Sequence, residues 1–240
     1  MIQIGNFFFR YRNALFPAIY ALLVFKSRPL LADYTLAWFL GFLVAFTGQL
    51  LRAVTIGFEY IIRGGRGRQV YAEHLVQGGV FAHCRNPLYL GNFLVLLGVG
   101  LAANSLLFLA TAIPFFVFAY AAIIAAEENY LRTKFGQEFN DYCARVNRLL
   151  PNVSGMRGTL SGMEYNWRRL LTAEYGSTYS WVSAMLVVAL KNQWLYRAYG
   201  SSYFVTVLLL SALVLVTAAY AVLRLLKKRG ILNASRQPAL

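Results

Sequence analysis

The amino-acid sequence predicts an all-α, polytopic integral membrane protein with about six transmembrane helices, two of which form a tight hairpin. Hydrophobic residues make up 59% of the 240 residues and charged residues only 13%, and the mean hydropathy is +0.52. A soluble domain has about 45–50% apolar and about 25% charged residues. The excess apolar surface therefore needs lipid to face.

The longest uncharged stretch, residues 88–126, predicts the hairpin. It contains no Asp, Glu, Lys, Arg or His, and a bilayer crossing needs only about 20 apolar residues. We therefore expect two helices in it, joined near residues 103–105. The other predicted crossings are residues 13–25, 34–56, 177–196 and 203–223. The first of these four is short and the third contains Lys191, so both are weaker than the rest.

The basic residues are distributed unevenly between the two predicted sides of the membrane. With six crossings, both termini and the loops 57–87 and 127–177 lie on one side, which carries all but four of the 23 Lys and Arg. Cytoplasmic loops carry such an excess, which predicts that the termini and both loops are cytoplasmic. The same distribution explains the net charge of +14 by topology and membrane lipids, without a nucleic-acid partner.

The two cysteines, Cys84 and Cys143, both fall on the predicted cytoplasmic side. Disulfides are rare in that compartment, so we expect free thiols. The sequence contains no CxxC pair and no His-rich cluster of the kind that holds zinc, and we predict no metal site from it.

One polar segment precedes the hairpin: residues 64–91 read GGRGRQVYAEHLVQGGVFAHCRNPLYLG. Pro87 suits the first turn of a helix because the N–H that it lacks would be unpaired there. Asn86 is then a plausible N-cap. A helix amino terminus together with Arg85 forms a positive edge that favours an anion. We expect the GRGR loop, residues 65–68, at the headgroup surface.

A second polar segment follows the hairpin: residues 127–151 read EENYLRTKFGQEFNDYCARVNRLLP. Its apolar residues recur at three- and four-residue spacing, which predicts a helix along the membrane surface, with Gly136 as a candidate break. The hairpin returns this segment to the first one. Glu127 and Glu128 therefore face a positive edge, and paired carboxylates at the end of a span are commonly functional. Either a lipid-facing pocket or a simple Arg–Glu ion pair explains these residues.

Together the two segments resemble the paired signature of the isoprenylcysteine carboxyl methyltransferase family and its phospholipid methyltransferase relatives. That signature runs approximately LV-x-x-G-[VI]-Y-x-x-x-R-H-P-x-Y-x-G and, after a helical hairpin, E-E-x-x-L-x-x-x-F-G-x-E. Here residues 75–91 read LVQGGVFAHCRNPLYLG, and residues 127–138 keep the second pattern. The order, the spacing and the intervening hairpin agree, over about residues 60–151.

The resemblance implies methyl transfer from S-adenosylmethionine to a lipophilic, membrane-resident acceptor, at a carboxylate, amine or hydroxyl group, in a cytoplasmic cofactor pocket. Arg85 and Glu128 are the predicted catalytic residues. The residues predicted to bind the cofactor are Glu73, His74, Leu75, Val76, Phe81, Asn86, Pro87, Leu88, Tyr89 and Glu127.

The chain departs from the family pattern at several positions. Asn86 replaces the motif histidine, as in many phospholipid methyltransferases, and Phe81 replaces the motif tyrosine. Glu73 stands where the eukaryotic prenylcysteine enzymes have a histidine, with His74 one position later. Ile123 replaces a basic residue associated with their substrate. Cofactor binding therefore carries over better than the identity of the acceptor.

Two other functions remain open: a nicotinamide-dependent membrane reductase of the sterol-reductase type, and a non-catalytic lipid-binding membrane protein. The intact EExxLxxxFGxE pattern favours methyl transfer. Within the segment that precedes the hairpin, residues 64–91, we expect His83 and Cys84 to take no part in the site.

The chain is predicted to have three parts. They are amino-terminal transmembrane helices (1–58), the methyltransferase core (59–151), and an interfacial segment with two further transmembrane helices (152–240). Neither the role of the last part nor the oligomeric state follows from the sequence.

Overall fold

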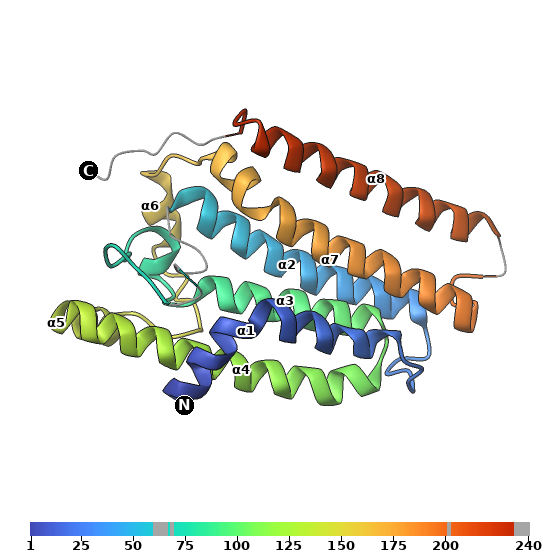
Figure 1. The fold of residues 1–240 in the computed structure, drawn as a ribbon, viewed down its shortest axis with the longest axis horizontal. Helices are drawn as coiled ribbons and strands as arrows, with labels where there is room; N and C mark the ends of the chain where they lie inside the picture. Colours follow the sequence, from blue (N-terminus) through green and yellow to red (C-terminus); the bar gives the residue numbers. More distant parts are fainter. Residues whose placement is uncertain (60–66, 68–69, 201–202, 233–240) are drawn as a thin grey trace.

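In the computed structural model, residues 1–59, 67, 70–200 and 203–232 are described, and all regular secondary structure in these ranges is helical. Most of the GRGR loop, including Arg66 and Arg68, lies outside them. Six long helices run roughly side by side (Figure 1). They are α1 (Ile2–Tyr20), α2 (Tyr34–Phe58), α3 (Pro87–Ala102), α4 (Leu106–Phe135), α7 (Trp167–Tyr196) and α8 (Tyr203–Lys228). The short helices are η1 (Ala21–Val24), η2 (Gly79–Ala82), α5 (Gln137–Arg145) and α6 (Met156–Ser161).

Three of the long helices, α2, α4 and α8, are each long and apolar enough to cross a membrane, and α3 is a shorter apolar helix. The prediction of an all-α integral membrane protein is thus supported, while six crossings stay a prediction. Among the described residues of α8, none is buried. This helix is the outermost of the bundle and packs on α7 (Figure 1), where Tyr220 stacks on Tyr175 and Tyr179.

The predicted hairpin is confirmed: α3 ends at Ala102 and α4 begins at Leu106. Its tip is held by Asn104, whose Oδ1 accepts from the N–H groups of Leu30 and Leu31 at 2.8 and 2.9 Å. The Asn104 Nδ2 atom donates to the Leu31 carbonyl at 2.7 Å. The hairpin is therefore tied to the loop that precedes α2.

Backbone contact between α2 and α3 fixes the position of the motif helix. A Cβ atom on Gly98 would lie 2.4 Å from the amide nitrogen of Ala45 and 2.5 Å from the carbonyl oxygen of Gly41. Only glycine permits helices to approach so closely. Gly98 therefore belongs to a helix-packing surface, and α3 lies in close contact with α2.

The predicted crossing at residues 13–25 is wrong in its boundaries, because α1 begins at Ile2 and includes Arg10 and Arg12. The aromatic run before them is part of the same helix, and the Arg12 guanidinium lies over the Phe9 ring, 4.3 Å from its centroid. Such a cation–π contact lets an arginine remain inside an apolar helix. Gly5 brings α1 against α4, since a Cβ there would lie 2.0 Å from the Ala122 carbonyl oxygen.

Two further boundaries differ from the prediction. The helix α7 begins at Trp167, ten residues before the predicted crossing. The helix α4 continues past the glutamate pair to Phe135, and the chain then breaks at Gly136, which has a φ of +53°. A positive φ is readily adopted only by glycine. The apolar residues of the segment 127–151, which were predicted to share one helix, are therefore divided between α4 and α5.

The loops and short helices that carry the motifs gather at one end of the bundle (Figure 1). The amino terminus of α1, the carboxyl ends of α2, α4 and α8, and the starts of α3 and α7 lie there. This is the grouping that the predicted topology requires. Its assignment to the cytoplasm stays a prediction.

Candidate functional site

A cavity of about 2240 Å³ lies among α1, α2, α3, α4 and α7. Ligand pockets are usually about 300–1,000 Å³, so the volume is sufficient for two molecules. All twelve residues predicted for the site line this cavity: Glu73, His74, Leu75, Val76, Phe81, Arg85, Asn86, Pro87, Leu88, Tyr89, Glu127 and Glu128. The structure therefore brings both motif segments to one space, as their neighbouring positions predicted.

Glu128 is held between two arginines. Its Oε1 atom lies 3.3 Å from Nη2 of Arg85 and accepts from Nε of Arg148 at 3.1 Å, while Oε2 pairs with Nη2 of Arg148. The hydrogen bond to Glu128 raises the pKa of Arg148 above its ordinary value. The Arg–Glu ion pair left open by the sequence is thus present. It joins the segment before the hairpin to the segment after it.

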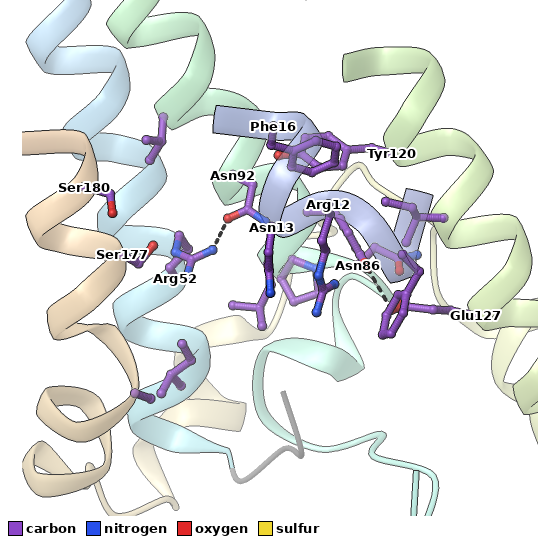
Figure 2. Close-up of a pocket in the computed structure, with 18 of the residues that line it drawn as sticks. Arg12, Asn13, Phe16, Arg52, Asn86, Asn92, Tyr120, Glu127, Ser177 and Ser180 are labelled. Atoms are coloured by element: carbon purple, nitrogen blue, oxygen red, sulfur yellow. Dashed lines mark hydrogen bonds between the residues drawn. The ribbon is translucent and has the colours of Figure 1, made fainter. Parts of the chain in front are cut away.

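Glu127 has different surroundings from its neighbour. The Tyr89 hydroxyl donates to Oε1 of Glu127 at 2.7 Å, and Glu127 forms no ion pair within the described part of the chain. Figure 2 shows Glu127 at one end of the pocket, near Arg12 of α1 and Asn86. The tyrosine of the first motif therefore orients the first glutamate of the second, and one carboxylate oxygen is left for a ligand.

Residues 73–76 lie at the cavity, and side chains of α4 and α5 bind the residues on either side of them, Ala72 and Gln77. Lys134 donates to the Ala72 carbonyl. Gln77 donates to Glu138 at 2.9 Å and accepts from Arg145 at 3.1 Å. Of the four predicted residues, the first two are exposed and the last two are half-buried.

The start of α3 corrects the prediction that the Asn86 side chain caps this helix. Pro87 is its first residue and Asn86 occupies the N-cap position, but the Asn86 side chain caps no helix N–H. Its Nδ2 atom instead donates to the Arg148 carbonyl at 3.0 Å. That carbonyl belongs to the chain beyond α5, so the amide is used to close the loop. Tyr142 closes it further by donating to the Phe81 carbonyl at 2.7 Å.

His83 and Cys84 do not line the cavity. The His83 Nδ1 and Nε2 atoms lie 2.6 Å from the Asn152 carbonyl oxygen and 2.9 Å from the Thr159 hydroxyl. The buried Cys84 thiol donates to the Leu149 carbonyl at 3.2 Å, and burial raises its pKa. Both cysteines are free. The structure thus keeps this pair away from the cavity, and the expectation that it takes no part in the site stays a prediction.

Several polar residues of the cavity were not predicted for it (Figure 2). They come from α1, α2, α3 and α7: Arg12, Asn13, Arg52, Asn92, Ser177 and Ser180. Lys191 also lines the cavity and donates to the Leu23 carbonyl at 2.9 Å. The signal available in the sequence was a charged residue inside an apolar span, which is costly and commonly functional. It applied to Arg52 and to Lys191.

Comparison with known proteins gives two kinds of match. Residues 36–138 match the family model described as phospholipid methyltransferase. Two similar proteins are the cobalt-zinc-cadmium resistance protein CzcN of Cupriavidus metallidurans and the nickel-cobalt-cadmium resistance protein NccN of Alcaligenes xylosoxydans xylosoxydans. The first is 37% identical over 84 residues, which are 35% of this chain and 38% of that protein. The second is 32% identical over 118 residues, which are 49% of this chain and 50% of that protein.

The chain thus spans half or less of the length of these two relatives. No solved structure matches it. The segment matched by the family model contains α2, α3 and α4 almost entirely, together with all twelve predicted site residues. The central part of this chain, residues 36–138, is thus similar to the phospholipid methyltransferase family.

Proposed function

We propose that this protein transfers a methyl group from S-adenosylmethionine to a lipophilic acceptor that resides in the membrane. The observation that carries the proposal is the Tyr89–Glu127 contact. It joins the two family motifs at the wall of a cavity of about 2240 Å³ and leaves one carboxylate oxygen of Glu127 for a ligand. The family match of the surrounding segment supports the same reaction.

The polar groups of this cavity fit the proposed cofactor. S-adenosylmethionine carries a sulfonium, an ammonium, a carboxylate and a ribose diol. A carboxylate such as Glu127 accepts strongly from an ammonium or a diol. Arg85 offers a buried Nε–H that has no partner among the described residues, which suits a carboxylate. The rings of Phe81 and Tyr89 line the same cavity, and aromatic faces attract cations such as the sulfonium.

When bound, S-adenosylmethionine would supply an electrophilic methyl group on its sulfonium. The contribution of the chain is alignment: Tyr89 orients Glu127, and the Arg85–Glu128–Arg148 cluster holds the loops that close the polar end. Well-aligned reactants gain on the order of 7–11 kcal/mol. Catalytic roles for Arg85 and Glu128 stay a prediction.

Apolar and aromatic residues of the cavity support a lipophilic acceptor. Among its lining residues are Phe16, Tyr20, Trp181 and Val188. Two more, Val24 of η1 and Val187 of α7, are 69% and 47% exposed. We propose that the cavity opens between η1 and α7 towards the bilayer, so that a lipid chain enters from the side. The carboxyl-terminal third then contributes one wall through α7, while α8 anchors the protein.

The excess of basic residues at the loop end supports a cytoplasmic site.

The names of the two relatives concern metal resistance. Among the described residues, no group of three or more His, Cys, Asp or Glu is arranged to hold a metal ion. Resistance still gives a phenotype to examine: we propose that deletion of the corresponding gene lowers growth in cobalt, zinc or cadmium. An unchanged growth curve would remove metal resistance from the proposal, without affecting methyl transfer.

Calorimetry on the detergent-purified chain tests the cofactor. We expect S-adenosylmethionine to bind and NADPH not to bind. Binding of NADPH alone would support the reductase alternative, and binding of neither would support a non-catalytic protein. Asp141→Asn is a matched control, because Asp141 is an exposed carboxylate of α5 that does not line the cavity. It should retain the affinity of the unmodified chain.

A further inference from the structure

A buried polar network joins α2, α3 and α7 beside the cavity. The Arg52 Nε atom donates to Oε2 of Glu174 at 2.8 Å, and Nη2 donates to Oε1 at 2.7 Å. Arg52 and Glu174 side chains are each 3% exposed. Gln49 donates to the same carboxylate at 3.2 Å and accepts from the Trp181 indole at 3.0 Å. The network therefore fixes the orientation of one guanidinium from several sides.

The arrangement leaves donors of Arg52 for a ligand. A guanidinium has five N–H donors. Two are taken by Glu174, and one on Nη1 is donated to Oδ1 of Asn92. Two remain without a partner in the described part of the chain. Arg52 and Asn92 both line the cavity, whereas Glu174 does not. Figure 2 shows the Arg52–Asn92 bond within the pocket, with Ser177 of α7 nearby.

The backbone of α3 also makes room for this arginine. A Cβ atom on Gly91 would lie 2.6 Å from Cγ of Arg52, so a larger residue would displace the side chain. Gly91 and Asn92 thus accommodate Arg52 from one helix, and Glu174 orients it from another. A buried ion pair is weak support for a purely stabilising role, because desolvation offsets much of the attraction.

We propose that Arg52 and Asn92 bind the head group of the lipid acceptor through its hydrogen-bond-accepting oxygens, and that Glu174 is the positioning residue that aims Arg52 at it. The inference rests on the proposed function. An oxyanion is preferred, since a guanidinium with two free N–H groups meets two oxygens at once. Arg12, which forms no ion pair among the described residues, adds positive charge to the same cavity. Through Glu174, the part of the chain outside the family match takes part in acceptor selection.

The first test uses the chain without cofactor and two single-chain amphiphiles, dodecyl phosphate and dodecyltrimethylammonium. Thermal unfolding in a neutral detergent measures binding, because a ligand of the folded state raises the midpoint. We expect dodecyl phosphate to raise the midpoint and dodecyltrimethylammonium not to. The shift should be lost in Asn92→Ala and in Glu174→Asp, which shortens the carboxylate arm and keeps its charge. An equal shift for both amphiphiles, or an unchanged shift in both variants, overturns the proposal.

The second test measures transfer of labelled methyl groups from S-adenosylmethionine to a total membrane lipid extract. In Asn92→Ala and Glu174→Asp we expect the half-saturating lipid concentration to rise roughly 10- to 100-fold, the size expected for losing a hydrogen bond to a charged group. The affinity for S-adenosylmethionine should stay within about twofold, because these residues lie outside the proposed cofactor contacts. Asn104→Ala is the matched control. Asn104 is as buried as Glu174 but lies at the hairpin tip and does not line the cavity, so this variant should lower stability and leave the lipid dependence unchanged.

The two proposals fail in different ways. If the unmodified chain does not bind S-adenosylmethionine, the proposed function is wrong and the acceptor role of Arg52 falls with it. If the chain methylates lipid but both variants keep its lipid dependence, the head-group subsite is wrong and methyl transfer stands.

Discussion

The adjacent glutamates of α4, Glu127 and Glu128, give the sharpest prediction, because their contacts assign them different roles. Glu127→Gln keeps an oxygen that accepts from Tyr89 and removes only the charge. Losing a charge-assisted hydrogen bond to the cofactor costs about 1.5–3 kcal/mol, or roughly 10- to 150-fold in Kd. We expect the thermal midpoint of the cofactor-free protein to stay nearly constant, since Glu127 pairs with no cation in the described structure.

Glu128→Gln should do the opposite. It leaves Arg85 and Arg148, whose side chains are 13% and 50% exposed, without their carboxylate. Removing one partner of a fully buried ion pair costs about 3–5 kcal/mol. Because water screens the half-exposed Arg148, we expect about 2–3 kcal/mol. For a chain of this size, that lowers the midpoint of unfolding by about 4–12 °C.

The assay is the same for both variants: tryptophan fluorescence follows thermal unfolding in detergent, and calorimetry gives the affinity for S-adenosylmethionine. The contacts of the two glutamates predict that Glu127→Gln mainly lowers the affinity for S-adenosylmethionine and Glu128→Gln mainly lowers stability. Equal losses of stability in the two variants would refute the structural distinction between them. An unchanged affinity in Glu127→Gln would remove that residue from the cofactor site.

Two other predictions concern packing and thiol chemistry. Gly98→Ala should destabilise the purified protein strongly, because the new Cβ would lie 2.4 Å from a backbone nitrogen of α2. Gly176→Ala is the control and should be close to neutral, because the space around Gly176 is open. Equal thermal midpoints for the two variants would contradict the α2–α3 contact. Maleimide at pH 7 should label Cys143 before Cys84, because Cys84 is buried and its raised pKa leaves less thiolate. Mass spectrometry measures the labelling rate of each cysteine in the folded protein, and raising the pH should narrow the difference between the two rates. Faster labelling of Cys84 than of Cys143 would contradict the burial of Cys84.

Local signals were sufficient to predict the hairpin and the motif segments. An uncharged run longer than one crossing requires a turn, and Asn104 lies at that turn. Pro87 marked the start of α3 because its missing N–H is tolerated there. Both statements depend on neighbours in sequence only. For the same reason the two motif segments could be expected on one side of the hairpin, where the cavity lies.

The parts that could not be predicted depend on contacts between distant elements. Consecutive residues on a helix point in directions about 100° apart, so Glu127 and Glu128 have different partners although both line the cavity. Which of them pairs with the arginines depends on how α4 is rotated against its neighbours. The Arg52–Glu174 pair joins residues 122 positions apart. Asn86 would have capped α3 in isolation, but a carbonyl from beyond α5 takes its amide.

The central claim is tested most directly by incubating the detergent-purified chain with methyl-labelled S-adenosylmethionine and a total membrane lipid extract, followed by chromatography of the lipids. We predict a labelled lipid product that is strongly reduced with Glu127→Gln and retained with Asp141→Asn. The absence of labelled lipid with the unmodified chain, or equal labelling with Glu127→Gln, would contradict the proposed methyltransferase site.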